Sequence, residues 1–200
     1  MKIRYIIVGL AAAATVAITA LGVMEWQRHA LTETAQQTPV DIGGPFTMTA
    51  HDGKTVTEQD LVGRRAVIFF GFTHCPDVCP TTLNEVAGWL DALGEDGELI
   101  DPYFVSVDPA RDTPERMGEY SGYFSPRITG LVGTDEQLAE MAEGYRLYYD
   151  RIDLDDGDYV MDHSAAVYLM DGEGRFFDAI TYTATFDEAV AKLRRLIAKG

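Results

Sequence analysis

Residues 66–80 read AVIFFGFTHCPDVCP, and this stretch decides the fold. Its first part, residues 66–72, is a short apolar run of the kind that forms a buried central strand. Residues 81–93 then carry apolar side chains at a helical period. The two cysteines of the chain, Cys75 and Cys79, therefore lie where a buried strand ends and a helix begins. Open α/β folds place their functional sites at such junctions.

Further strands and helices alternate on both sides of this stretch. Thr113 and Pro114 predict a helix start, with Thr113 as the N-cap and Pro114 at the first helical position. Strands that alternate with helices and end in a hairpin and a helix predict an α/β sandwich with a mixed sheet, and a thioredoxin-like arrangement fits that order. The expected strands are 45–50, a second one after the turn at 51–54, 66–72, 103–107, 165–169 and 175–180, and the expected helices are 81–93, one from 113, one from 134 to about 145, and 187–198.

The N-terminus differs from the rest of the chain. Lys2 and Arg4 precede an apolar run from Tyr5 to Val23. At about 19 residues, this run is long enough to cross a hydrocarbon core as a helix, and the preceding positive charges keep the N-terminus in the cytoplasm. A cleaved signal peptide is the alternative, although its apolar core would be shorter. We expect residues 1–24 to be a cytoplasmic N-terminus and membrane anchor, an N-terminal transmembrane helix, and both interpretations place the globular part across the membrane.

Composition and charge indicate where the folded domain begins and which classes of partner are excluded. Residues 25–40 are polar and have no apolar face to bury, which predicts a tether, so we expect the folded domain to span 41–200. The hydrophobic fraction of 46% suits a packed core. The formal net charge of −16 argues against binding to nucleic acid, which needs clustered Lys and Arg. It also argues against docking on anionic lipid through a basic surface.

Three interpretations of the cysteine pair remain open from the residues alone. If Cys75 and Cys79 occupy one helical turn, positions i and i+4 face the same way and both sulfurs converge. A static disulfide would close a very short loop and gain little chain entropy. A redox dithiol needs a reactive thiol with a resolving partner, although the thioredoxin motif has a shorter spacing than this one. A metal site is the third interpretation, because two thiolates suit Cu(I), whereas Cu(II) or zinc favours another ligand.

Four histidines are candidates for that further ligand. His29 lies in the tether, and His51 lies in a predicted turn where a hydrogen-bonding role is expected. His74 adjoins Cys75, but adjacent side chains on an extended backbone point to opposite faces. His163 precedes a predicted buried strand, and spacing alone leaves it between a structural role and a ligand role.

The stretch 71–80, GFTHCPDVCP, closely resembles the signature of the SCO/SenC family of copper proteins. Three further segments are similar to family signatures, namely IGGPF at 42–46, SVDPARDTP at 106–114 and DHS at 162–164. Their order and spacing run through nearly the whole expected domain, from about Ile42 to Leu196. An N-terminal anchor also fits that family.

This resemblance implies a thioredoxin-like fold with an extra β-hairpin, and it implies copper, as Cu(I) or Cu(II), held by Cys75, Cys79 and His163. Family members assist assembly of the CuA centre of cytochrome c oxidase subunit II. The resemblance therefore implies a metallochaperone rather than an enzyme, with that subunit and a periplasmic copper donor as partners. We expect a single-pass protein of the cell inner membrane, with the globular domain on the periplasmic side.

An alternative function uses the same two sulfurs. Family members are also argued to be thiol-disulfide reductases that keep the CuA-site cysteines reduced, which would make Cys75 and Cys79 a redox-active pair. A copper or redox sensor is a further alternative. A peroxide-reducing thiol enzyme of related fold fits less well, because this loop presents two nearby thiols and a remote histidine, and a shared fold does not establish chemistry.

The residues before His163 are strongly acidic. Segment 150–158 contains five Asp residues and Gly157. We interpret this segment as a solvated acidic hairpin. The competing hypothesis is a mobile loop that gates copper transfer.

Smaller expectations concern polar residues and methionines around the site. Asp108 and Arg111 are expected to hold the loop after a central strand. Asp162 is expected to orient His163 or to end its strand, and Asp77 to adjust the electrostatics of the cysteines or to cap the helix. Two methionines, which could donate sulfur, are expected to fill gaps in the core instead: Met161 and Met170.

Overall fold

The structure is a computed structural model that describes residues 42–199. The expected anchor at 1–24 and the expected tether at 25–40 lie outside the described residues. Among residues 42–199, no helix combines the length and the apolar character that a membrane span requires.

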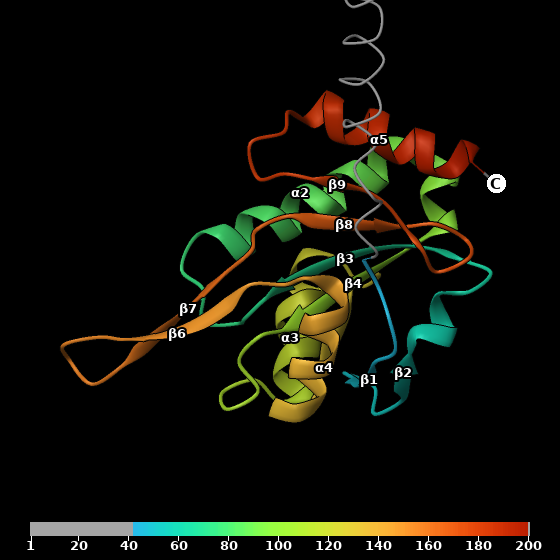
Figure 1. The fold of residues 1–200 in the computed structure, drawn as a ribbon. Coiled ribbons are helices and arrows are strands. Elements are labelled where there is room, and N and C mark those ends of the chain that lie inside the picture. Colours follow the sequence, from blue (N-terminus) through green and yellow to red (C-terminus); the bar gives the residue numbers. More distant parts are fainter. Residues whose placement is uncertain (1–41, 200) are drawn as a thin grey trace, which may run out of the picture. The chain divides into compact units, whose positions relative to one another are not determined.

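A seven-stranded sheet, in the order β2-β1-β5-β4-β3-β8-β9, forms the centre of the fold (Figure 1). Strand β3 pairs in parallel with β4 and antiparallel with β8, so the sheet is mixed. The structure therefore confirms the mixed sheet of a thioredoxin-like α/β fold. The strands are β1 (Thr47–Ala50), β2 (Thr55–Thr57), β3 (Arg65–Gly71), β4 (Ile100–Ser106), β5 (Thr129–Val132), β8 (Val167–Met170) and β9 (Phe176–Ile180).

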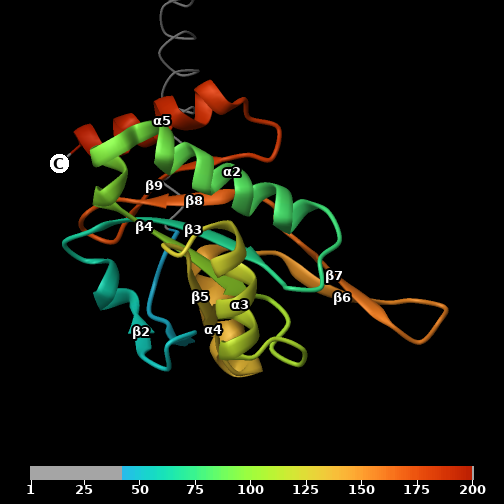
Figure 2. The ribbon, with the colours of Figure 1, turned by 180° about the vertical axis from the view of Figure 1, so that it is seen from behind.

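Within residues 42–199, four α-helices pack on this sheet. Each of three of them begins at a threonine N-cap whose side chain accepts a backbone N–H, a contact that stabilises the first turn. Helix α5 lies beside α2, as both views of the molecule show (Figures 1 and 2). The helices are α2 (Val78–Leu93), α3 (Pro114–Phe124), α4 (Asp135–Tyr145) and α5 (Phe186–Ala198), and two short 3-10 helices are η1 (Glu58–Leu61) and η2 (Gly94–Leu99).

Two neighbouring aromatic residues of β3 show which helices cover each face of the sheet. Successive strand residues point to opposite faces. The ring of Phe69 stacks on Phe104 of β4, with centroids 5.9 Å apart, and Phe104 in turn lies 5.8 Å from Tyr120 of α3. The ring of Phe70 lies on the other face, 5.8 Å from Tyr145 of α4. Helices α3 and α4 therefore cover opposite faces of the sheet.

A separate two-stranded hairpin, β6 (Tyr149–Asp153) with β7 (Tyr159–His163), projects from the body of the domain (Figures 1 and 2). Its two strands are paired at five positions, from Tyr149 opposite His163 to Asp153 opposite Tyr159. The interpretation of this segment as an acidic hairpin is confirmed, and the competing loop is confined to the turn between β6 and β7. The extra hairpin that the family resemblance implied is present.

Candidate metal centre

The cysteine loop connects the buried end of β3 to the start of α2. Residues 66–72 are all buried, which confirms the central strand expected there. Cys79 lies in the first turn of α2 and is fully buried, whereas Cys75 lies in the preceding loop and is half-buried. The two cysteines therefore do not share one helical turn, because the helix begins only at Val78. Their sulfurs still lie within 4.8 Å of each other. The backbone N–H of Cys79 donates to Cys75 Sγ over 3.4 Å.

His163, the last residue of β7, brings an imidazole to the two thiols. Its Nε2 lies 3.7 Å from Cys79 Sγ. The ligand atoms of Cys75, Cys79 and His163 all lie within 4.8 Å of one another. The structure thus brings together the three residues that the family resemblance implied as ligands.

The orientation of the His163 ring is set by its surroundings. Its Nδ1–H donates to the backbone carbonyl of Ser164 over 3.0 Å, which leaves Nε2 free to face the cysteines. The ring packs edgewise against Phe69 and Phe72, with centroids 6.2 Å and 6.0 Å away. Asp162, which was expected to orient His163 or to end its strand, is exposed and does not make this contact.

The two thiols differ in their acid–base behaviour. A hydrogen bond from Cys79, together with the contact with His163 and the backbone amides of Asp77 and Cys79, lowers the pKa of Cys75 to about 3 despite its partial burial. The same shared hydrogen bond and deep burial raise the pKa of the Cys79 thiol above its ordinary value. Cys75 is therefore the thiolate of the pair, and Cys79 is its protonated, buried partner.

Soft thiolate sulfurs with one imidazole nitrogen form a donor set that suits copper. Two thiolates satisfy Cu(I), and the added nitrogen meets the preference of Cu(II) for nitrogen donors. The Cys75, Cys79 and His163 cluster therefore fits a copper ion.

The other sequence candidates have different roles. His74 is exposed, and its Nδ1 lies 3.2 Å from Thr73 Oγ1, outside the ligand cluster. His51 accepts the backbone N–H of Gly130 over 3.1 Å, which confirms its expected structural role. Asp77 occupies the N-cap position of α2, although its side chain makes no capping hydrogen bond. The methionines pack as expected, since Met170 is buried and Met161 lies against the core.

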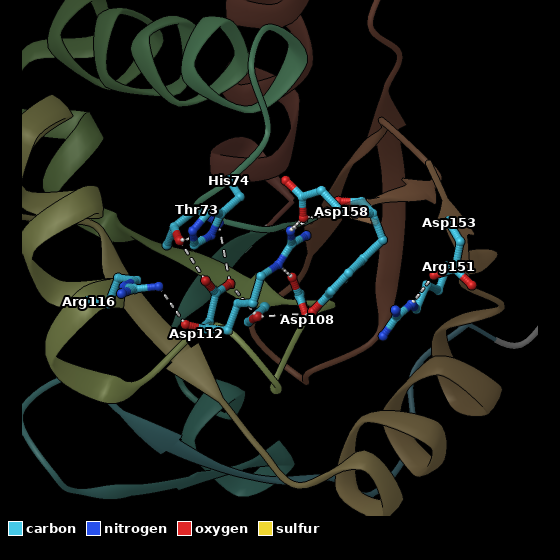
Figure 3. A network of polar contacts seen from close by, with 11 residues as sticks. Thr73, His74, Asp108, Asp112, Arg116, Arg151, Asp153 and Asp158 are labelled. Carbon is cyan, nitrogen blue, oxygen red and sulfur yellow. Dashed lines mark hydrogen bonds and ion pairs between the residues drawn. The ribbon is translucent and has the colours of Figure 1, made fainter. Parts of the chain in front are cut away.

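A polar network links the cysteine loop to the segment 108–112 that follows β4 (Figure 3). Thr73 Oγ1 donates to Asp112 Oδ1 over 2.6 Å, and Arg111 Nε donates to Asp108 Oδ2 over 2.5 Å. The expectation that Asp108 and Arg111 hold this loop is confirmed. Sequence reasoning missed Asp112, Ser164 and the two phenylalanines beside His163, because only the folded chain brings them to the site.

A surface recess of about 550 Å³ adjoins the cysteine loop. Thr73 and His74 form one side of it, and α3 contributes Tyr120, Tyr123 and Phe124. Tyr123 is 87% exposed, so the recess offers aromatic surface to a partner that approaches the cysteines.

Comparison with known proteins gives a consistent result. A model of the SCO1/SenC family matches residues 34–198. The chain is 45% identical over 136 residues to "Protein SCO1 homolog 1, mitochondrial" of Arabidopsis thaliana, covering 68% of this chain and 41% of that protein. It is 39% identical over 139 residues to the "SCO2-like protein RP587" of Rickettsia prowazekii, covering 68% of each chain.

Solved structures agree in fold over most of the chain. The structure of Bradyrhizobium japonicum ScoI with copper bound matches with a TM-score of 0.72 and 46% identity, covering 78% of this chain and 99% of that one. The chain spans about half the length of the first curated relatives that it matches.

Proposed function

Because the chain belongs to the SCO1/SenC family, we propose that it is a copper metallochaperone, a carrier rather than an enzyme, that supplies the CuA centre of cytochrome c oxidase subunit II. The observation that carries this proposal is the convergence of Cys75, Cys79 and His163 within 4.8 Å. The copper-bound structure of the Bradyrhizobium japonicum relative, at 46% identity, supports copper as the cargo.

The unequal environments of the ligands support a carrier rather than a permanent store. Cys79 is fully buried, whereas Cys75 is half-buried and His163 comes from a separate hairpin. Loss of the imidazole would leave Cu(I) on two thiolates, which still satisfy it. Cargo transfer then proceeds by ligand exchange, in which an acceptor thiolate binds copper on the exposed side before Cys75 releases it.

The acceptor has to reach copper directly, because ligand exchange needs an incoming ligand within bonding distance. The recess between the cysteine loop and α3 offers contact surface next to that approach. We propose that subunit II docks over this side of the site, and that a periplasmic copper donor uses the same exposed side.

A metal titration of the reduced protein tests the carrier function. We expect one tightly bound copper ion per chain, and we expect His163→Ala to weaken the binding of Cu(II), which prefers nitrogen donors. His74→Ala is the matched control, since His74 is next to the cysteines in sequence but outside the cluster, and its copper binding should equal that of the wild type. A wild-type protein without appreciable copper affinity would sink the proposal.

The thiol asymmetry favours a second candidate function, a thiol-disulfide reductase. The Cys75 thiolate would attack a disulfide of the acceptor and form a mixed disulfide, releasing one acceptor thiolate. Cys79, on losing its proton, would then attack the Cys75 sulfur. The products are a Cys75–Cys79 disulfide and a second acceptor thiol, so two electrons pass to the acceptor. The buried Cys79 is placed to be the resolving cysteine.

One variant separates the two functions. His163→Ala removes a copper ligand but neither sulfur. A carrier therefore loses copper affinity while its rate of reducing an oxidised subunit II peptide is retained. The reductase becomes the main function if that rate is high and copper delivery to the peptide is undetectable. A sensor function predicts neither delivery nor reduction of the peptide.

We further propose that residues 1–24 anchor the protein in the cell inner membrane with the globular domain in the periplasm. The charge order that precedes the apolar run supports this orientation. The intact protein should be found in the membrane fraction. Protease added to spheroplasts should digest its globular domain. Recovery of a protected domain from intact spheroplasts would refute this location.

A further inference from the structure

Arg111 links the segment after β4 to the hairpin that carries His163. Its Nε donates to Asp108 Oδ2 over 2.5 Å, and its Nη1 donates to the backbone carbonyl of Tyr159 over 3.0 Å. The side chains of Arg111 and Asp108 are 17% and 3% exposed. Asp108 and Arg111 belong to the same segment, so this buried pair fixes the Arg111 side chain, because removing one partner would leave an uncompensated charge. The bond from Arg111 to the Tyr159 carbonyl then joins the segment to the hairpin.

Tyr159 is the hairpin residue that contacts both Arg111 and Asp108. Its ring lies between two guanidinium groups, 3.6 Å from Cζ of Arg111 and 3.7 Å from Cζ of Arg151. Such cation–π contacts add to the apolar packing of the ring. The hydroxyl of Tyr159 donates to Asp108 Oδ1 over 2.9 Å. Asp108 therefore accepts hydrogen bonds from both Arg111 and Tyr159.

The contacts of Arg111 constrain His163 in two ways. Tyr159 and His163 are the first and last residues of β7, which is paired with β6 along its whole length. The four steps between them span roughly 13 Å of strand, so the position of Tyr159 limits where His163 can lie. In addition, Arg111 Cζ lies 5.7 Å from the ring of Phe72, and that ring packs edgewise on His163.

The same segment is tied at its other end to the cysteine loop. Asp112, which is 3% exposed, accepts Thr73 Oγ1 over 2.6 Å, the Thr73 N–H over 3.3 Å and Ser106 Oγ over 2.6 Å. The backbone N–H of Asp108 donates to Ser106 Oγ over 3.0 Å. Asp108 and Asp112 are thus joined through one buried hydroxyl, and Thr73 is two residues from Cys75 (Figure 3).

We propose that segment 108–112 holds the cysteine loop and the histidine hairpin in a fixed relation, and that Arg111 is the positioning residue that sets the distance from His163 to the two thiols. This inference rests on the proposed copper function, because the position of His163 matters to cargo only if His163 is a ligand. Arg111 acts through Tyr159 and Phe72, since the cluster itself consists of Cys75, Cys79 and His163.

A double-mutant cycle on copper affinity tests this role. Arg111→Gln removes the charge and the hydrogen bonds to Asp108 and to the Tyr159 carbonyl. We expect it to weaken Cu(II) binding about 10-fold, the effect typical of residues that orient a ligand. Cu(I) binding should change much less, because two thiolates suffice for Cu(I). In a His163→Ala background, Arg111→Gln should have no further effect on Cu(II) binding, since the ligand that it positions is gone.

The matched control is Arg64→Gln. Arg64, like Arg111, pairs with an aspartate: it donates to Asp101 at 2.7 Å and 2.6 Å, but it lies at the opposite end of β3 from the cysteine loop. Its loss should leave copper affinity and the copper absorption spectrum unchanged. If Arg111→Gln fails to fold, Tyr159→Leu tests the same contact from the hairpin side, and Tyr159→Phe, which keeps the stacked ring, should restore most of the affinity.

Two results would overturn the inference. One is an equal loss of Cu(II) affinity caused by Arg111→Gln in the wild-type and His163→Ala backgrounds. The other is unchanged His163 ring signals in the NMR spectrum of metal-free Arg111→Gln, in which displacement of the ring relative to Phe69 and Phe72 should shift them. The NMR measurement needs no copper, so a protein that binds no copper but shows the shift would refute the proposed function and leave the positioning role intact.

Discussion

At the scale of single residues, Gly71 shows how closely the strand approaches the buried thiol. A Cβ atom at Gly71 would lie 2.6 Å from Cys79 Sγ and 2.8 Å from the ring of Phe104. Both neighbours are fully buried, so neither has free space to move into. Only glycine at this position lets the sulfur sit against the end of β3.

Gly71→Ala should therefore destabilise the protein and displace Cys79. We expect a loss of about 1–3 kcal/mol in the free energy of unfolding, the range for overpacking a core, together with weaker copper binding. Urea denaturation of the metal-free protein measures the first effect. The control is Gly122→Ala in α3, where no atom lies within 4 Å of the added Cβ and where the better helix propensity of alanine should stabilise the protein. Equal stability of Gly71→Ala and the wild type would contradict this account.

The lowered pKa of Cys75 predicts an unusual pH profile for alkylation. The thiolate is the reactive form, and a pKa of about 3 keeps Cys75 ionised far into the acid range. The rate of alkylation by iodoacetamide should stay nearly constant between about pH 8 and pH 5, whereas that of an ordinary thiol falls tenfold for each pH unit below its pKa. Cys79→Ala removes the largest cause of the shift, so it should raise the pKa and restore the ordinary decline. A wild-type profile that already declines in this way would disprove the assignment of Cys75 as the thiolate.

At the scale of elements, the hairpin of β6 and β7 was indicated by its acidic composition and by the family resemblance, but not by a strand pattern in its residues. Strand β6 is almost wholly exposed, and its charged residues hide the alternation that predicts a half-buried strand. Strand β5 was also missed, because its four residues are too few to show a period. Helix α2 begins before the expected residue 81 because Pro80 is tolerated within the first turn of a helix. The N-caps Thr113 and Thr134 and the buried strand at 66–72 were predictable, since each has a strong local signal.

Copper should change the dynamics of this hairpin. Binding of His163 to copper fixes the last residue of β7, so the paired amides of residues 149–163 should exchange hydrogen more slowly in the copper-loaded protein. Hydrogen exchange measured with and without copper tests this expectation, and the amides that pair β8 with β9 serve as the internal control. Equal protection of 149–163 in both states would rule out a gate in the hairpin.

At the scale of the whole molecule, copper should stabilise the fold, because it joins segments that are far apart in the chain. Its ligands come from the loop after β3, from α2 and from β7. Binding to the folded state alone adds about 2.7 kcal/mol when free copper is at 100 times its dissociation constant. Chemical denaturation with and without Cu(I) measures this gain. Cys75→Ser should abolish most of the gain, and a copper-independent midpoint for the wild type would contradict copper binding by the folded state.

The ligand residues of the candidate site were predictable from the sequence, but the residues that position them were not. Cys75 and Cys79 are marked by their junction between strand and helix, and His163 by its family signature. Arg111 and Tyr159 are 48 positions apart in the chain. Helical or strand periodicity in the sequence does not indicate a contact between residues so far apart. The orienting acceptor of His163 is a backbone carbonyl, which any residue at position 164 could supply. The side chains of a site can therefore be predicted more readily than the geometry that holds them.

The separation of 84 residues between Cys79 and His163 has a consequence for biosynthesis. Chains emerge from the ribosome N-terminus first, so both thiols appear long before the imidazole does. A chain that stops short of residue 163, or one whose hairpin has not docked, offers a two-sulfur site without nitrogen. The complete donor set is therefore a property of finished, correctly folded molecules alone, and Cu(II), with its preference for nitrogen, distinguishes them from incomplete ones.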